Sequence, residues 1–138
     1  MNIEQIDKNL ASLGVKEPDV EWISSHDSRF SLHGVSYNKE YNLYERVPRE
    51  VALTVSKSVA SLSLRTSGGR LRFTTDSDKL ALKVYFDRMD ARSIMSLQAS
   101  AGFDVYLEQD GKEVFLTSVY PPVNAKDGFS TFVSLPEG

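Results

Sequence analysis

Two histidines, His26 and His33, are the side chains of this chain whose ordinary pKa lies closest to neutral pH. A serine hydrolase needs a serine held at a tight turn, a histidine base and usually an acid. The chain contains neither Gly-x-Ser-x-Gly nor Gly-Asp-Ser, and no Asp-x-x-His pair. We therefore expect no catalytic residue in this chain. His33, in Leu32-His33-Gly34, is expected to be a turn histidine and is kept as a candidate binding residue.

Metal-binding patterns are equally sparse. The chain has no cysteine, which excludes disulfides, thiolate catalysis and iron–sulfur clusters. His26 with Asp27 lacks the spacing of a known metal cage, and Asp76-Ser77-Asp78 lacks the glycine and distal glutamate of a calcium loop. We predict no metal and no cofactor, with a structural calcium at Asp76–Asp78 as the alternative.

Carboxylates and aromatic residues offer two further kinds of chemistry. Glycoside hydrolysis needs a pair of carboxylates, and the candidates are Asp87, Asp90, Asp104 and Asp110. Nothing in the sequence indicates that one of them has the raised pKa that a general acid needs. Trp22, Tyr37, Tyr41 and Tyr44 lie close together in sequence and suggest a platform on which a sugar could stack. The alternative is that these rings cover the edge of a sheet.

Composition limits the classes of partner. The 138 residues are 41% hydrophobic and 25% charged, with a net charge of −3, and the 16 Lys and Arg form no run. We expect one globular domain that binds no nucleic acid. No apolar run is long enough for a membrane span, and Met1–Gln5 does not resemble a signal peptide. The chain as written is predicted to be cytoplasmic; removal of a signal would instead make it secreted or periplasmic. The sequence does not determine an oligomeric state.

Two short helices are predicted. Ile3, Ile6, Leu10 and Leu13 fall on one helical face, which predicts a helix over about 3–13 within an arm of residues 1–18. Pro48 suits a first helical position, and Val51, Val55 and Val59 are spaced by four. This spacing predicts a helix, or a pair of helical turns, over about 48–63, with the valines and Leu62 on its buried face.

The rest of the chain has the alternation of short strands. Strands are predicted at 20–23, 30–32, 70–74, 80–86, 103–107, 113–119 and 129–135, with Leu71, Phe73 and Phe103 among the inward-facing side chains. Asp110-Gly111 predicts a tight hairpin, and Ile94 and Met95 are predicted to return to the core. The fold class is therefore mainly β: an antiparallel β-sandwich over 19–138, truncated where the last strand ends close to Gly138.

Two stretches resemble a known family. Thr66–Ser77 is similar to its T-A-G-G-R-V-R-F-x-T-D-S segment, and Gly102-Phe103-Asp104-Val105-Tyr106 to its G-x-D-L-Y signature, with Val in place of Leu. Phe30–Gly34, Arg46-Val47-Pro48 and Tyr120-Pro121-Pro122 follow in matching order. The chain resembles the N-terminal β-sandwich domain of bacterial two-domain SGNH/GDSL-type esterases, over about residues 20–135.

The resemblance implies a jelly-roll-like sandwich similar to carbohydrate-binding modules, placed before an SGNH hydrolase domain in cis. The parent protein would be a serine ester hydrolase, whose catalytic Ser, Gly, Asn and His lie in that second domain. The implied function is a non-catalytic accessory domain that positions substrate or the catalytic domain. The alternatives are an independent carbohydrate-binding module, with a sugar or acylated sugar as ligand, and a protein interaction module. Six residues are the candidates for binding or domain contact: Trp22, His33, Tyr44, Arg46, Asp104 and Tyr106.

Overall fold

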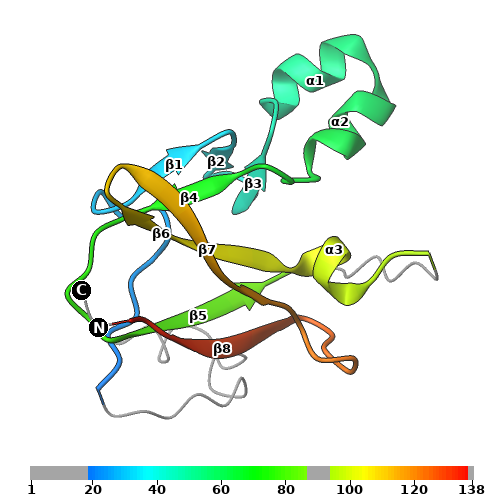
Figure 1. The fold of residues 1–138 in the computed structure, drawn as a ribbon. Coiled ribbons are helices and arrows are strands. Elements are labelled where there is room, and N and C mark those ends of the chain that lie inside the picture. Colours follow the sequence, from blue (N-terminus) through cyan, green and yellow to red (C-terminus); the bar gives the residue numbers. More distant parts are fainter. Residues whose placement is uncertain (1–18, 87–93, 137–138) are drawn as a thin grey trace. The chain divides into compact units, whose positions relative to one another are not determined.

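The computed structural model describes residues 19–86 and 94–136, and the chain divides into two compact units (Figure 1). One unit is Trp22–Asp76, and the other contains the chain from Ser77 onward together with the N-terminal residues up to Glu21. The helix predicted at 3–13 and the arm of residues 1–18 lie outside the described residues.

Two short antiparallel strand pairs form the sheets of the unit Trp22–Asp76. β1 (Ser31–His33) pairs with β4 (Arg70–Arg72), and β2 (Ser36–Asn38) pairs with β3 (Leu43–Glu45). The strand predicted at 20–23 is wrong, because these residues find no ladder partner and remain irregular. The β2–β3 hairpin was not predicted, since its tyrosines suggested a binding surface rather than a strand pair.

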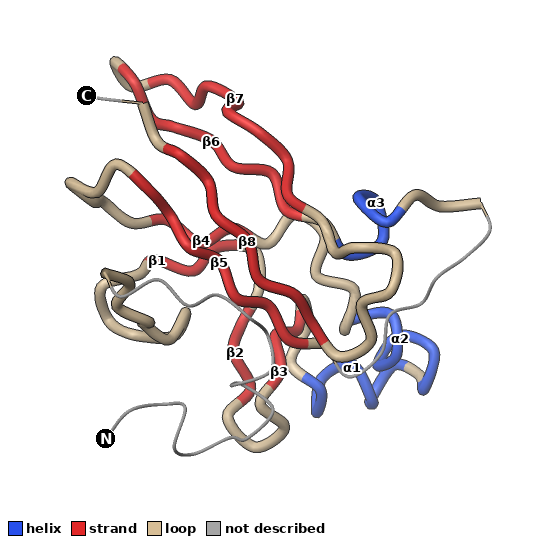
Figure 2. Tube along the Cα trace, turned by 90° about the horizontal axis from the view of Figure 1, so that it is seen from below, coloured by secondary structure: helices blue, strands red, loops and turns tan. Residues whose placement is uncertain are grey.

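The segment predicted to be helical contains two helices, α1 (Arg49–Val55) and α2 (Lys57–Ser63), which lie side by side in Figures 1 and 2. Ser56 separates them with extended backbone, and its hydroxyl accepts a hydrogen bond from the Val59 amide as the N-cap of α2. This break resets the helical phase, so the predicted buried face is wrong. Ala52 and Ala60 are buried instead, whereas Val51, Val55 and Leu62 are more than half exposed.

The second unit contains two longer strand pairs, of which only β6–β7 is a hairpin. β5 (Lys79–Tyr85) pairs with β8 (Gly128–Ser134), and β6 (Phe103–Gln109) pairs with β7 (Lys112–Val119), all antiparallel. The short helix α3 (Leu97–Ala101) precedes β6 and was not predicted. The turn predicted between β6 and β7 is confirmed, since Asp110 and Gly111 both have the positive φ of a type I′ turn.

The small core of this unit lies between β7 and β8. Val119, Phe129 and Val133 are buried, and the Phe129 ring lies 6.5 Å from that of Phe103. Phe103 is nevertheless 44% exposed. The other unit keeps Leu71 and Phe73 similarly exposed, although Phe73 meets Phe30 edge to face at 5.2 Å.

Ile94 and Met95 are the clearest misses of the predicted core. Ile94 is 87% exposed and Met95 is 44% exposed. Both belong to the turn and irregular backbone before α3, where no neighbouring strand holds them inward.

The predicted class, mainly β with antiparallel sheets and few short helices, is confirmed. The described strands form four two-stranded sheets and no closed barrel; the jelly-roll topology remains a prediction. No helix within the described ranges has the length and hydrophobicity to cross a membrane.

Candidate functional site

The G-x-D-V-Y stretch begins where α3 ends. Ser96 caps the start of α3 by accepting a hydrogen bond from the Ala99 amide at 3.2 Å. At the other end the Gly102 amide donates to the Gln98 carbonyl at 2.9 Å. A Cβ at position 102 would lie only 2.4 Å from that carbonyl oxygen. Glycine is therefore required here so that the chain can turn from α3 directly into β6.

Asp104 is tied to the neighbouring strand. It lies opposite Ser118 in the β6–β7 ladder, and the Ser118 hydroxyl donates to its Oδ1 at 2.5 Å. The carboxylate is exposed to solvent. Asp104 thus links two strands on the outer face of this sheet, where it is also accessible to a second molecule or domain.

Tyr106 extends the same face with an aromatic pair. Its ring meets that of Phe115 edge to face, with centroids 5.6 Å apart, and both residues are more than half exposed. A β-bulge between Val105 and Tyr106 shifts the register by one residue. Because of this bulge Asp104 faces Ser118 rather than Thr117, whereas Tyr106 keeps the register counted from the turn and faces Phe115.

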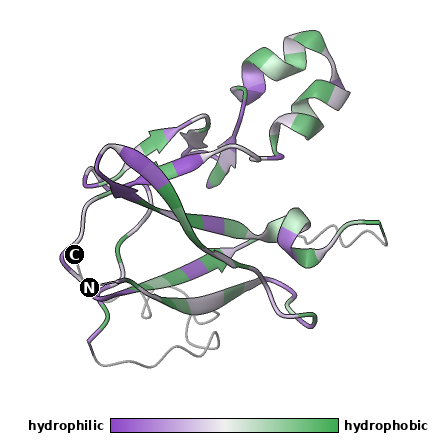
Figure 3. Ribbon diagram, viewed as in Figure 1, coloured by the Kyte–Doolittle hydropathy of each residue, from purple (hydrophilic) through white to green (hydrophobic). Residues whose placement is uncertain are grey.

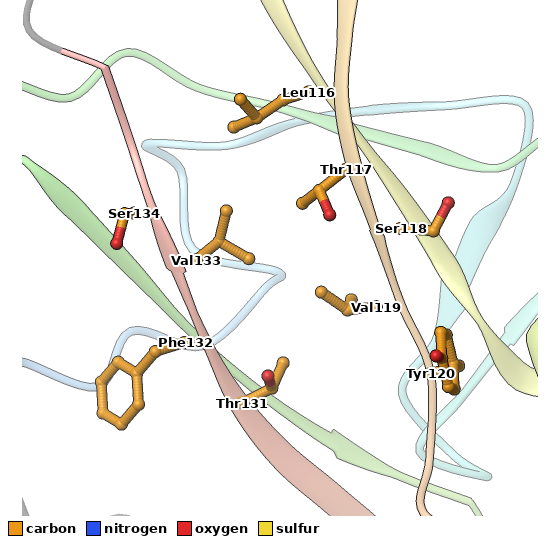
Figure 4. Close-up of a pocket in the computed structure, with 9 residues that line it drawn as sticks. All are labelled: Leu116, Thr117, Ser118, Val119, Tyr120, Thr131, Phe132, Val133 and Ser134. Atoms are coloured by element: carbon orange, nitrogen blue, oxygen red, sulfur yellow. The ribbon is translucent and has the colours of Figure 1, made fainter.

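A hollow of about 440 Å³ lies between β7 and β8 (Figure 4). Its walls are uncharged and contain both apolar and hydroxyl side chains: Leu116, Thr117, Ser118, Val119, Tyr120, Thr131, Phe132, Val133 and Ser134. Tyr120 is 55% exposed, so its ring is accessible. The Phe132 ring extends from the side of β8 that faces away from β7 (Figure 4). Neutral walls with hydroxyl groups and an accessible ring suit a neutral polyhydroxylated ligand better than an ion. The sequence analysis missed this site because its residues are brought together only by the approach of β7 and β8.

The aromatic residues of the other unit contact one another. His26 stacks on Tyr37 with ring centroids 4.2 Å apart and planes 7° from parallel, and Tyr44 tilts against Tyr37 at 5.3 Å. The Tyr44 hydroxyl also hydrogen-bonds the Ser25 hydroxyl. The Tyr41 ring carries the Arg49 guanidinium 5.1 Å above it. These contacts occupy ring faces that the predicted sugar platform would need, and sugar binding there stays a prediction.

The remaining candidate residues do not gather at one place. Trp22 is half-buried, and His33 is exposed at the end of β1 opposite Arg70. Arg46 is exposed, and its amide donates to the Ser63 carbonyl at 2.8 Å, which ties the end of α2 to the residue after β3. Their roles in binding remain predictions.

Ser24 and His26 form the closest approach to a nucleophile–base pair. The Ser24 hydroxyl lies 3.0 Å from Nδ1 and 3.2 Å from Nε2 of His26, so one oxygen occupies the edge of the ring that carries both nitrogens. The carboxylate of the next residue, Asp27, binds Arg29 instead of His26. It accepts hydrogen bonds from Arg29 Nε at 2.9 Å and from Arg29 Nη2 at 3.2 Å. In the described part of the chain, no carboxylate hydrogen-bonds His26 as the acid of a catalytic triad would.

The Asp27–Arg29 pair has a measurable consequence. The side-chain and backbone hydrogen bonds from Arg29 lower the pKa of Asp27 from 3.8 to about 2. We predict that Arg29→Gln returns this pKa towards 3.8, as measured by NMR titration of the carboxyl carbon. Because the folded pKa is depressed, the pair's stabilisation is present above pH 3.8 and disappears as the pH falls towards 2. An unchanged pKa in the variant would contradict this assignment.

The predicted metal sites can be compared with the positions of the His, Asp and Glu side chains. Within residues 19–86 and 94–136, no three His, Cys, Asp or Glu side chains gather closely enough to hold a metal ion. Asp87 and Asp90 lie outside the described residues.

The comparisons with known proteins give one match. Residues 20–137 match the family described as GxDLY, the N-terminus of SGNH hydrolase-type esterases. The chain belongs to the GxDLY family. No curated protein and no solved structure gives a significant match. The match confirms the family that the sequence blocks resemble, and the matched range includes Gly102–Tyr106.

The structure gives the local roles of the signature residues in this GxDLY domain. Gly102 allows the helix-to-strand turn, and Asp104 and Tyr106 lie on the exposed face of β6. Ser118, the hydrogen-bonding partner of Asp104, was missed from the sequence because a plain count from the Asp110-Gly111 turn places Thr117 opposite Asp104.

Proposed function

We propose that this chain is a non-catalytic accessory domain that acts with an SGNH hydrolase domain and helps to hold the sugar part of an acylated sugar substrate. The observation that carries the proposal is the match of residues 20–137 to the N-terminal domain of SGNH hydrolase-type esterases.

The hollow between β7 and β8 supports the substrate part of the proposal. An ester substrate on a sugar presents neutral hydroxyl groups and one apolar ring face. The hollow offers hydroxyl groups on Thr117 and Thr131, together with the exposed ring of Tyr120. A substrate held there would be bound through uncharged contacts, so its affinity should depend little on salt.

The proposal has a kinetic test in the protein that carries both domains. Tyr120→Ala should raise the KM for an acetylated oligosaccharide about fivefold, because one ring contact is lost. It should leave kcat/KM for p-nitrophenyl acetate unchanged, since this small ester needs no sugar contact. Tyr85→Ala is the matched control, because Tyr85 is 46% exposed on β5 and does not line the hollow.

Two outcomes would count against the proposal. Equal effects of Tyr120→Ala on both substrates would place Tyr120 outside substrate binding. Turnover of p-nitrophenyl acetate by the 138-residue chain alone, above the buffer rate and proportional to its concentration, would show that the chain is itself catalytic.

A further inference from the structure

A groove of about 410 Å³ runs along the pair of helices α1 and α2, on a surface that the proposed substrate contacts do not use. We call it the hairpin groove, and six residues line it: Arg49, Leu53, Lys57, Ala60, Ser61 and Leu64. Figure 3 shows hydrophobic residues along both helices. The groove thus combines an apolar floor with two cationic side chains.

The apolar side chains of this helix pair are unusually accessible. Exposed fractions reach 49% for Leu53 and 38% for Leu64, which both line the groove. Val51 and Val55 add two further exposed aliphatic side chains on α1. Exposed apolar side chains gathered along one groove, as Leu53 and Leu64 are, are typical of a surface that another protein covers.

The charge of the helix pair is opposite to that of the chain. The two helices contain the cations Arg49 and Lys57 and the carboxylate Glu50, which gives a formal charge of +1, and Arg46 and Arg65 flank them. The whole chain has a net charge of −3. Arg49 is also positioned, because its guanidinium lies over the Tyr41 ring and its amide donates to Glu45 Oε1 at 3.3 Å. The groove therefore favours an acidic surface as its partner.

This charge argues against a symmetric dimer of the chain through the same groove. A two-fold contact would place Arg49 and Lys57 of one copy against the same cations of the other. Like charges brought together at an interface are unfavourable, and Glu50 alone does not compensate for them. A different surface, with carboxylates around an apolar side chain, complements the groove.

We infer that the hairpin groove is the docking surface for the SGNH hydrolase domain, which would insert an aliphatic or aromatic side chain between Arg49 and Lys57 and pair these cations with carboxylates. The inference rests on the proposed function, since that function supplies the partner domain. Beyond that function, the inference specifies which surface contacts the hydrolase domain and which side chains make the contact.

Hydrogen exchange followed by mass spectrometry tests the inference. The polypeptide that carries both domains is compared with the 138-residue chain at the same concentration. Amides of residues 49–64 should exchange at least tenfold more slowly when the hydrolase domain is present. Leu53→Asp and Lys57→Glu should each remove this protection. Leu62→Asp and Ser58→Glu are the matched controls outside the groove and should retain it.

The outcomes separate this inference from the proposed function. The amides of 49–64 could exchange as fast in the two-domain protein as in the 138-residue chain, while Tyr120→Ala still raises the KM. This result would overturn the docking surface and leave the accessory function supported. Protection at 49–64 in the 138-residue chain alone, increasing with its concentration, would show a second copy in the groove and also overturn the inference. Loss of protection in both control variants would show general unfolding of the helix pair rather than docking, and would overturn it too.

Discussion

Gly128→Ala is expected to lower the free energy of unfolding by about 3 kcal/mol. Gly128 starts β8 opposite Tyr85 of β5, with a φ of +156°. An added Cβ would lie 2.1 Å from the Val84 carbonyl oxygen and 3.2 Å from the Tyr85 Cα. Both are backbone atoms of β5, so the clash cannot be relieved by rotating a side chain. The start of β8 would have to move away from β5. Urea unfolding followed by circular dichroism measures the loss.

Gly111→Ala is the matched control for this prediction. Gly111 has a φ of +72° in the β6–β7 turn, but no heavy atom lies within 4 Å of the position of its Cβ. Its substitution brings backbone strain without a clash and should cost about 1 kcal/mol. If the two variants unfold with the same midpoint and slope, β5 and β8 do not approach as closely at Gly128 as described.

Glu45→Ala is expected to cost about 2–3 kcal/mol of unfolding free energy. Glu45 is only 4% exposed, and its Oε1 accepts hydrogen bonds from Asn38 Nδ2 at 3.0 Å and from the Arg49 amide at 3.3 Å. The second bond satisfies an amide of the first turn of α1, which otherwise has no partner within the helix. Removal of the carboxylate leaves the half-buried amide of Asn38 and the backbone amide at the start of α1 without their acceptor.

Glu45→Gln distinguishes the acceptor from the charge. Its amide oxygen can keep both hydrogen bonds, so the expected loss is below about 1 kcal/mol. Thermal unfolding of the two variants at neutral pH measures the difference. A Gln variant as unstable as the Ala variant would show that the negative charge, rather than the acceptor oxygen, stabilises the start of α1. In the Ala variant α1 should also unfold locally more often, which would disrupt the hairpin groove because α1 forms one of its walls.

The β6–β7 hairpin illustrates how far local sequence signals reach. Alternation over Phe103–Leu107 and the Asp110-Gly111 pair predict two strands and a tight turn, since both depend on residues close together in the chain. The bulge after Val105 leaves no such signal. It nevertheless decides that Ser118, and not Thr117, hydrogen-bonds Asp104.

The helical segment shows a similar limit. Pro48 and the spaced apolar residues correctly predict helix in this part of the chain, since helix propensity and N-terminal signals are local. The spacing of the valines assumes one continuous phase, whereas the extended backbone at Ser56 starts a second helix with its own phase. Ala52 and Ala60 become the contact residues, and the larger Val51, Val55 and Leu62 are left exposed.

The sequence by itself determined the mainly antiparallel β class, the positions of β5 to β8, the tight turn after β6 and, through its ordered blocks, membership of the GxDLY family. These features depend on period, turn residues and short motifs, which are properties of neighbouring residues. Only the tertiary structure brought Asp104 to Ser118, formed the hollow between β7 and β8, and left a basic apolar groove on α1 and α2. Each of these joins residues that are distant in sequence or depends on which side chains a helix buries, and no local pattern determines such contacts.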